Sequence, residues 1–178
     1  NFKPKLESLL AYPVKRWKKA TEKRRVRSVE LSCTAGIAAI AVKQRVPCCK
    51  GDVITVFQID GNGAVFVRHE ICPKHDMLRI GFTMALKRDF RSFTWFGRGP
   101  HENYCDRKTG SAVGVYSFDV EALGHSYMRP QENGNRTELR WLEISDNSGS
   151  GILITGNHFS FSAWPYSQEE LEKAAHQH

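Results

Sequence analysis

Short β-branched and aromatic segments, separated by turn-forming residues roughly every ten positions, recur through most of the chain. The segments at residues 53–59 and 64–68 are joined by Asp60-Gly61-Asn62-Gly63, where glycine and asparagine allow the positive φ angles of a tight hairpin. Eight or more strands of this kind predict an all-β fold, an antiparallel β-sandwich or barrel. Further strands are predicted at residues 37–42, 78–86, 91–96, 112–119, 138–145, 151–155 and 158–163.

One short helix is predicted close to the C-terminal end. Ser167 and Glu170 have the spacing of a capping box, in which the serine side chain accepts from the backbone of Glu170 and the glutamate reaches back. Leu171, Ala174 and Ala175 supply a narrow apolar stripe, and we expect the helix over residues 167–175.

Positive charge is concentrated at the start of the chain. The whole sequence has a net charge of +7, but residues 1–27 hold ten basic and two acidic residues, whereas residues 28–178 hold 16 and 17. A nucleic-acid-binding protein usually spreads its basic residues over a folded face, and a single run is more often a solvated arm. We therefore divide the chain into a basic arm (1–27), irregular with a turn or two of helix, and a domain (28–178). We expect no nucleic-acid partner.

Composition and cysteine content place further limits on the protein. With 40% hydrophobic and 25% charged residues, the chain is typical of a globular domain, and no segment approaches the ~18 apolar residues of a membrane span. We therefore expect no membrane partner. Five cysteines favour a reducing, cytoplasmic location. His69-x-x-Cys72-x-x-His75 has suitable ligand types, but no second pair accompanies it, and we expect no metal and no other cofactor.

Two polar loops at residues 95–107 and 127–137 are the best candidates for a functional site. They combine acidic, amide, guanidinium and aromatic side chains, which suit sugar hydroxyls and the apolar faces of a pyranose ring. The structural alternative is a buried ion-pair network that ties the loops to the fold. The candidate residues for contact with substrate or with another domain are Glu102, Tyr104, Arg107, Glu132, Asn133 and Arg136.

Three motifs in these regions resemble a known family. They are WFGRGPHENY-x-DR at 95–107, Y-x-RPQENGNRT at 127–137 and FSAWPYSQEEL at 161–171. Their order and length closely resemble the C-terminal small-chain domain of family 2 β-galactosidases. The resemblance is strongest over residues 90–178 and weaker before them.

The resemblance implies a large antiparallel supersandwich of the galactose mutarotase type. In such enzymes the catalytic glutamates of the retaining hydrolysis of terminal β-D-galactosides lie in a separate (β/α)₈ barrel, which the small-chain domain closes over. The family's substrate-stacking tryptophan lies downstream of the third motif and does not correspond to Trp164. We therefore expect no catalytic residue in this chain, no activity of the chain alone, and the barrel domain and a β-galactoside as partners.

Other functions stay open at this point. Glu102 and Glu132 would form a glycosidase pair only at a suitable separation and with one raised pKa. A stand-alone galactoside-binding or mutarotase-like module would use a histidine and a glutamate in a cleft. A nucleic-acid or anionic-surface binder would use residues 3–27, with Trp17 against a base or against the body of the protein. We also expect self-association through an exposed edge strand, unless the C-terminal helix covers that edge.

Overall fold

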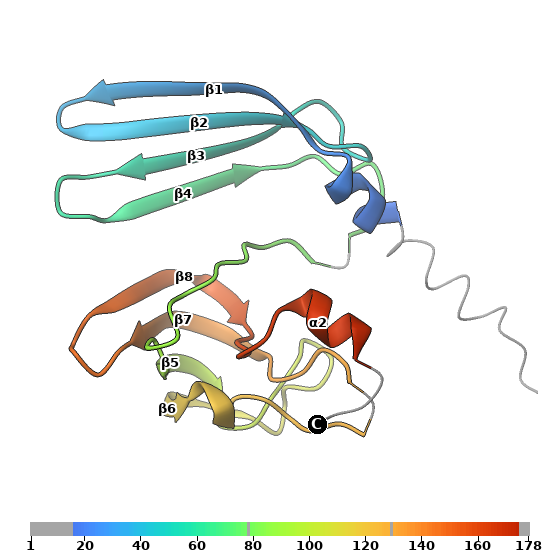
Figure 1. The fold of residues 1–178 in the computed structure, drawn as a ribbon, viewed down its shortest axis with the longest axis vertical. Coiled ribbons are helices and arrows are strands. Elements are labelled where there is room, and N and C mark those ends of the chain that lie inside the picture. Colours follow the sequence, from blue (N-terminus) through green and yellow to red (C-terminus); the bar gives the residue numbers. More distant parts are fainter. Residues whose placement is uncertain (1–15, 78, 129, 175–178) are drawn as a thin grey trace, which may run out of the picture. The chain divides into compact units, whose positions relative to one another are not determined.

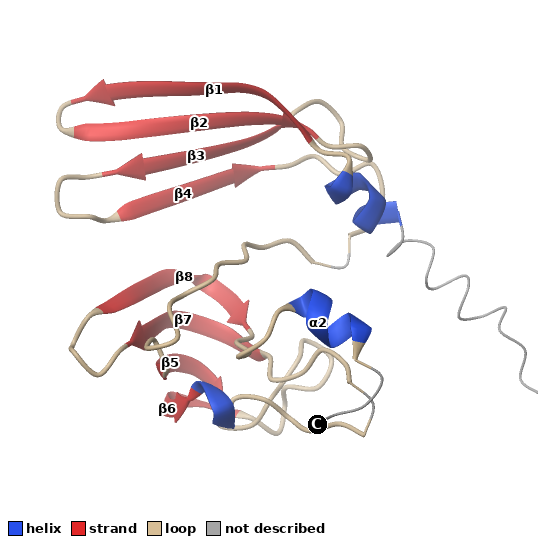
Figure 2. Ribbon diagram, viewed as in Figure 1, coloured by secondary structure: helices blue, strands red, loops and turns tan. Residues whose placement is uncertain are grey.

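The computed structural model describes residues 16–77, 79–128 and 130–174 (Figure 1). The described strands form two four-stranded antiparallel sheets, in the orders β1-β2-β3-β4 and β6-β5-β7-β8 (Figure 2). The two antiparallel sheets confirm the predicted all-β fold class and are consistent with a β-sandwich. The strands are β1 (Arg25–Thr34), β2 (Ile37–Arg45), β3 (Val53–Ile59), β4 (Val65–Glu70), β5 (Ser92–Gly99), β6 (Ala112–Asp119), β7 (Arg136–Ser145) and β8 (Gly151–Phe161).

The chain divides into two compact units, with the boundary between Thr83 and Met84. The first unit contains the sheet β1–β4 and the second contains the sheet β5–β8. The predicted boundary between residues 27 and 28 lies inside β1, so the last residues of the predicted arm belong to a sheet. Within the arm, residues 16–22 are helical, and residues 1–15 lie outside the described part. The division into an arm and one domain stays a prediction.

The hairpin predicted from the loop at residues 60–63 is confirmed. β3 and β4 pair in antiparallel register from Ile54↔Glu70 to Ile59↔Val65. The carboxylate of Asp60 accepts from the backbone N–H groups of Asn62 and Ala64, each at 2.9 Å. Gly63 has a φ of 84°, the left-handed conformation that glycine adopts at least cost. Local turn chemistry therefore fixes this connection.

The strand predictions differ from the structure in three places. The segments predicted at 151–155 and 158–163 form a single strand, β8. Residues 79–86 are not a strand, although Ile80 and Phe82 have strand-forming side chains, which are 54% and 62% exposed. A strand exists only where a neighbour completes its hydrogen-bond ladder, and the sequence pattern contains no information about that neighbour. β1 is an unpredicted strand: Val29, Leu31 and Cys33 alternate with polar residues, but the adjoining basic run indicated an arm.

The core of the second unit forms around β5 and β7. β5 turns Phe93 and Trp95 inward, and Trp95 is fully buried with its indole N–H donating to the Arg98 carbonyl at 3.0 Å. Gly97 also faces inward, where a Cβ atom would lie 2.9 Å from Leu139 Cα, so only glycine allows this approach. The other buried members of the cluster are Leu123, Leu139, Leu142 and Ile144.

The predicted C-terminal helix is confirmed as α2 (Gln168–Lys173). Both halves of its capping box are present: the Ser167 hydroxyl accepts from the Glu170 N–H, and the Glu170 carboxylate accepts from the Ser167 N–H at 2.7 Å. Ala174 lies at the C-cap, and Ala175 falls outside the described residues. None of the helices in the described part is long and apolar enough to span a bilayer.

Candidate functional site

The two polar loops of the sequence prediction are joined by a pair of asparagines in the second unit. The backbone N–H of Asn103 donates to the Asn135 carbonyl, and the Asn135 amide donates to the Asn103 carbonyl, both at 2.7 Å. The side-chain oxygen of Asn103 accepts from the N–H and the hydroxyl of Thr137. Asn103 is fully buried, so these bonds satisfy polar groups that have no access to water. They fix the loop after β5 against the loop before β7.

We call the region where the loop after β5 meets the loop before β7 the junction. Glu102 lies at the centre of the junction, with its side chain only 11% exposed. One carboxylate oxygen accepts from the Tyr127 hydroxyl and from Arg107 Nη2 at 2.9 Å, and the other accepts from the Gly134 N–H at 2.8 Å. Burial raises the pKa of Glu102, but the hydrogen bonds from Tyr127, Gly134 and Arg107 outweigh burial and lower the pKa below its usual value. Glu102 is therefore held as a carboxylate.

Gly134 is the residue that permits this contact. Its φ of 71° is left-handed, and a Cβ atom at this position would lie 2.6 Å from the Leu123 carbonyl oxygen. A side chain here is excluded both by the backbone conformation and by the close approach. The glycine therefore lets its own N–H reach Glu102.

Arg107 and Tyr104 lie together at the junction, where Arg107 is exposed and Tyr104 is half-buried. The Arg107 guanidinium lies 4.5 Å from the centroid of the Tyr104 ring and also donates to the Tyr127 hydroxyl at 3.1 Å. Burial, followed by the negative charge of Glu102, raises the pKa of the Tyr104 hydroxyl. The Arg107 side chain is 54% exposed, so part of its guanidinium is accessible to a ligand.

Arg136 is a buried cation held mainly by backbone carbonyls. It is 3% exposed; its Nη1 donates to Leu123 and Gly134, both at 2.6 Å, and its Nη2 donates to Pro100 at 3.1 Å. Burial lowers the pKa of Arg136, and the charge of Glu102 opposes this effect. The guanidinium carbon also lies 5.5 Å from the Trp95 ring centroid. This arrangement ties three segments of backbone together.

Asn133 and Glu132 lie behind the junction. Asn133 is buried, and its side chain accepts from the His125 N–H at 3.0 Å and donates to the Gln131 carbonyl at 2.9 Å. Its own carbonyl accepts from Trp164 Nε1 at 3.0 Å, which connects the third sequence motif to the second. Glu132 is half-buried, and its charge contributes to the raised pKa of Tyr104.

A cavity of about 530 Å³ opens beside the junction, within the size range of small-molecule sites. Three of the six candidate residues line it, namely Glu102, Arg107 and Arg136, while Tyr104, Glu132 and Asn133 are not part of its wall. Phe118 and Leu123 provide apolar lining. The remaining polar lining residues, which the sequence prediction did not select, are His101, His125 and Tyr127.

The missed residues have recognisable roles. His125 and Tyr127 pack edge to face with ring centroids 4.4 Å apart, and Tyr127 donates to Glu102. Tyr127 belongs to the second sequence motif, and the motif could therefore have identified it as a candidate site residue. His125 precedes the motif, and only the hydrogen bond from its backbone N–H to Asn133 reveals its position.

The electrostatics of Glu102 do not suit acid catalysis. A glycosidase general acid needs a raised pKa, whereas the pKa of Glu102 is lowered. The predicted ion-pair network is present in part, because Glu102 pairs with Arg107 while Arg136 bonds to carbonyls. Two further ion pairs of the second unit share Glu138: Lys108 and Arg98 lower its pKa to about 2.

The His69-x-x-Cys72-x-x-His75 motif lies in the first unit. The His69 Nδ1 atom is 2.8 Å from the Thr55 hydroxyl, and its ring packs edge to face on Phe82. Across the described residues, no group of three or more potential ligands is arranged to hold a metal. His69 therefore has a packing and hydrogen-bonding role within the sheet β1–β4.

Comparison with known proteins gives one consistent result. Residues 7–178 match the family model described as the β-galactosidase small chain. The chain is 32% identical over 164 residues to a β-galactosidase of Priestia megaterium, covering 90% of this chain and 16% of the relative. It is 31% identical over 173 residues to a β-galactosidase of Lactobacillus delbrueckii subsp. bulgaricus, covering 93% of this chain and 17% of the relative.

A third relative, a β-galactosidase of Vibrio cholerae, is 40% identical over 123 residues, which cover 67% of this chain and 11% of the relative. The chain thus spans about a sixth of the length of the first two relatives. The match to the family model extends over nearly all of the sequence, including both sheets. The chain therefore belongs to the β-galactosidase small-chain family.

Proposed function

We propose that the chain is the accessory small-chain domain of a β-galactosidase that hydrolyses terminal β-D-galactosides with retention of configuration. The observation that carries this proposal is the family match over residues 7–178 to proteins of which the chain spans about a sixth. The catalytic glutamates then belong to a barrel domain outside this chain, which is its partner. The lowered pKa of Glu102 supports a role for this residue in positioning the loops.

Complementation of a relative tests this proposal. The chain alone is expected to give no hydrolysis of a nitrophenyl β-galactoside. Fused to the Priestia megaterium β-galactosidase in place of its matching segment, the chain is expected to restore hydrolysis, with β-galactose as the first anomer detected by NMR. The matched control is the same enzyme with its own segment removed and nothing added. Hydrolysis by the isolated chain, abolished in Glu102→Gln, would overturn the proposal.

Sugar binding by the chain itself is a second candidate function, and the cavity beside Glu102 favours it. The cavity combines apolar lining from Phe118 with polar groups of Arg107, His101 and Tyr127, the combination that a pyranose requires. Titration with galactose, followed by NMR, is expected to give millimolar affinity that is lost in Arg107→Met. Arg91→Met, which removes the exposed ion pair with Asp119, is the control. Equal binding by both variants would exclude this cavity as the sugar site.

The cellular location is also a proposal. We place the protein in the reducing cytoplasm, because its five cysteines are free thiols and two of them, Cys48 and Cys49, adjoin a third, Cys72, without a disulfide bond. Burial raises the pKa of the Cys49 thiol, which favours its protonated form.

A further inference from the structure

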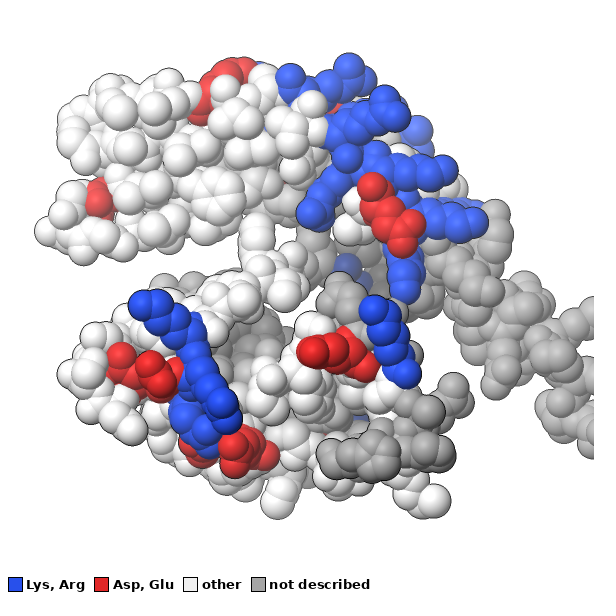
Figure 3. Space-filling model, viewed as in Figure 1, with Lys and Arg blue, Asp and Glu red and all other residues white. Residues whose placement is uncertain are grey.

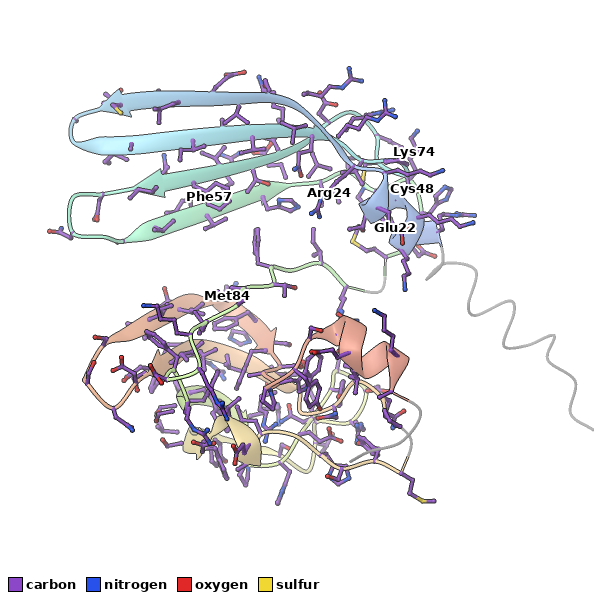
Figure 4. The ribbon with its side chains drawn as sticks, viewed as in Figure 1. Glu22, Arg24, Cys48, Phe57, Lys74 and Met84 are labelled. Atoms are coloured by element: carbon purple, nitrogen blue, oxygen red, sulfur yellow. The ribbon has the colours of Figure 1, made fainter. Side chains whose placement is uncertain are left out.

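A strongly basic surface lies at one end of the sheet β1–β4. Figure 3 shows lysine and arginine side chains gathered at the end where the chain enters β1, and Figure 4 labels Arg24 and Lys74 there. We call this region the basic end surface. Its basic residues are Arg16, Lys18, Lys19, Lys23, Arg24, Arg25, Arg27, Arg45, Lys50 and Lys74.

Three separate segments build the basic end surface, and hydrogen bonds hold them together. The indole N–H of Trp17 donates to the Asp76 carbonyl at 2.8 Å, which fixes the helix at residues 16–22 against the segment after β4. The backbone N–H of Lys74 donates to the Cys48 carbonyl, and that of Lys50 donates to the Cys72 carbonyl. The surface is therefore an assembled part of the fold and extends beyond the basic run of the sequence.

The charges of this surface are not balanced within it. Among the residues that the structure describes, its ten basic residues are accompanied by three acids, Glu22, Asp52 and Asp76, which leaves the described part of the surface with a net formal charge of +7. Arg25 lies directly opposite Arg45 in the register of β1 and β2, a like-charge pair that destabilises a sheet. A bound anion would reduce the repulsion between Arg25 and Arg45 and the repulsion among the excess positive charges of the surface. Relief of this repulsion, which is present in the free protein, would contribute to the free energy of binding.

The composition of the surface favours a polyanion over an acidic protein. Protein–protein interfaces have an apolar centre and few lysines, whereas half of the cations here are lysines and Trp17 is half-buried with its N–H satisfied. A polyphosphate backbone needs only closely spaced cations. We propose that the basic end surface binds the phosphate backbone of a nucleic acid without reading its sequence.

The structure differs from the solvated arm expected from sequence, for a physical reason. That expectation treated residues 1–27 as a solvated arm, whose charges are spread in space. In the structure, residues 16–22 are helical and β1 begins at Arg25. The helix is hydrogen-bonded to Asp76, close to Lys74, and the N–H of Lys50 is hydrogen-bonded to Cys72, so the charges are held together in space. Nucleic-acid binding at this surface is independent of galactoside hydrolysis.

Salt-dependent binding to a labelled 20-base-pair DNA duplex tests the proposal. With about six phosphate contacts, the affinity of the full chain is expected to fall roughly 10³-fold between 50 and 200 mM salt. Duplexes of different sequence are expected to bind within a few-fold of one another. No binding at 50 mM salt, or an affinity that is independent of salt, would overturn the proposal.

Charge reversal outside the basic run distinguishes the assembled surface from a linear arm. Lys50→Glu with Lys74→Glu is expected to lower the affinity at least tenfold and to reduce the salt slope by about two contacts. Lys87→Glu with Arg88→Glu, two exposed residues of the second unit, makes the same change in net charge and is expected to leave binding within twofold. Equal effects of the two double variants would contradict the proposed surface.

A competition experiment uses only the unmodified chain, so it tests the proposal even if these variants do not fold. Polyglutamate, a model for an acidic protein surface, is expected to displace the duplex from the unmodified chain at least tenfold less well than unlabelled DNA of equal charge. Displacement that is as good as or better than that by DNA would identify the surface as a site for acidic proteins and would overturn the proposal.

Discussion

The carboxylate of Glu102 accepts hydrogen bonds from donors in two different loops, those of Arg107 in its own loop and of Tyr127 and Gly134 in the other. From sequence, a glutamate among arginines and tyrosines is compatible with a sugar site and with a structural ion pair. The role of Glu102 depends on how many lone pairs of its carboxylate already accept hydrogen bonds from the protein. Because both oxygens are occupied and the pKa is lowered, Glu102 positions the loops and keeps its charge.

The Glu102 carboxylate gives a pH-dependent prediction. Its folded-state pKa lies below the unfolded value of about 4.5, so its contribution to stability is fully present above pH 4.5 and is lost as pH falls through the folded-state pKa. Glu102→Gln is expected to lower the free energy of unfolding by about 1–3 kcal/mol at pH 7. The difference from the unmodified chain is expected to shrink below pH 4.5, as measured by denaturant unfolding.

Glu143→Gln is the matched control for this measurement, because Glu143 is exposed on β7. It is expected to change the free energy of unfolding by less than about 0.5 kcal/mol. A Glu102→Gln deficit that stays constant from pH 7 to pH 3 would show that the ionised carboxylate is not what stabilises the junction.

At the scale of elements, local chemistry explains which predictions are confirmed. The β3–β4 hairpin and the cap of α2 each depend on residues close in sequence, Asp60 with Ala64 and Ser167 with Glu170. The segment at 79–86 is not paired as a strand in the described structure, whereas β1 pairs with the next strand, β2, across the two residues Ala35 and Gly36. A pattern of side chains reports the preference of a segment but not the presence of a partner strand.

The cap of α2 provides a prediction at this scale. Ser167→Ala removes the acceptor for the Glu170 N–H and is expected to destabilise the helix by about 0.5–2 kcal/mol. Hydrogen exchange of the amides at residues 168–173 is expected to accelerate accordingly. Ser167→Asp keeps an acceptor at the cap and is expected to retain most of the protection. Equal exchange in Ser167→Ala and the unmodified chain would show that the cap does not stabilise α2.

For the whole molecule, the sheet edges and the net charge act in opposite directions. Each sheet ends in two edge strands, and on β1 the side chains of Val29 and Leu31 are 61% and 70% exposed. Exposed apolar edges favour strand pairing between molecules, while the net charge of +7 opposes it at low salt. Self-association therefore stays a prediction, and salt is expected to increase it.

Sedimentation velocity at 50 and 500 mM salt tests this prediction. The chain is expected to shift toward larger species at high salt, and Val29→Lys with Leu31→Lys is expected to restore a monomer, because lysine on an edge strand blocks pairing. Thr109→Lys with Ser126→Lys, two exposed loop positions, adds the same charge and is the control. If the control loses self-association to the same extent, the loss is caused by the added net charge and not by the change on β1.

The sequence by itself determined the all-β class, the hairpin at Asp60, the capped helix and the three motifs of the small-chain family, because these depend on residues that are near one another along the chain. Only the tertiary structure decided that Glu102 is a hydrogen-bonded carboxylate, that Arg136 bonds to carbonyls, and that Lys50 and Lys74 join the basic run in one surface. The physical reason is that charge and hydrogen bonding act through space over a few ångströms, whereas sequence patterns record only spacing along the backbone.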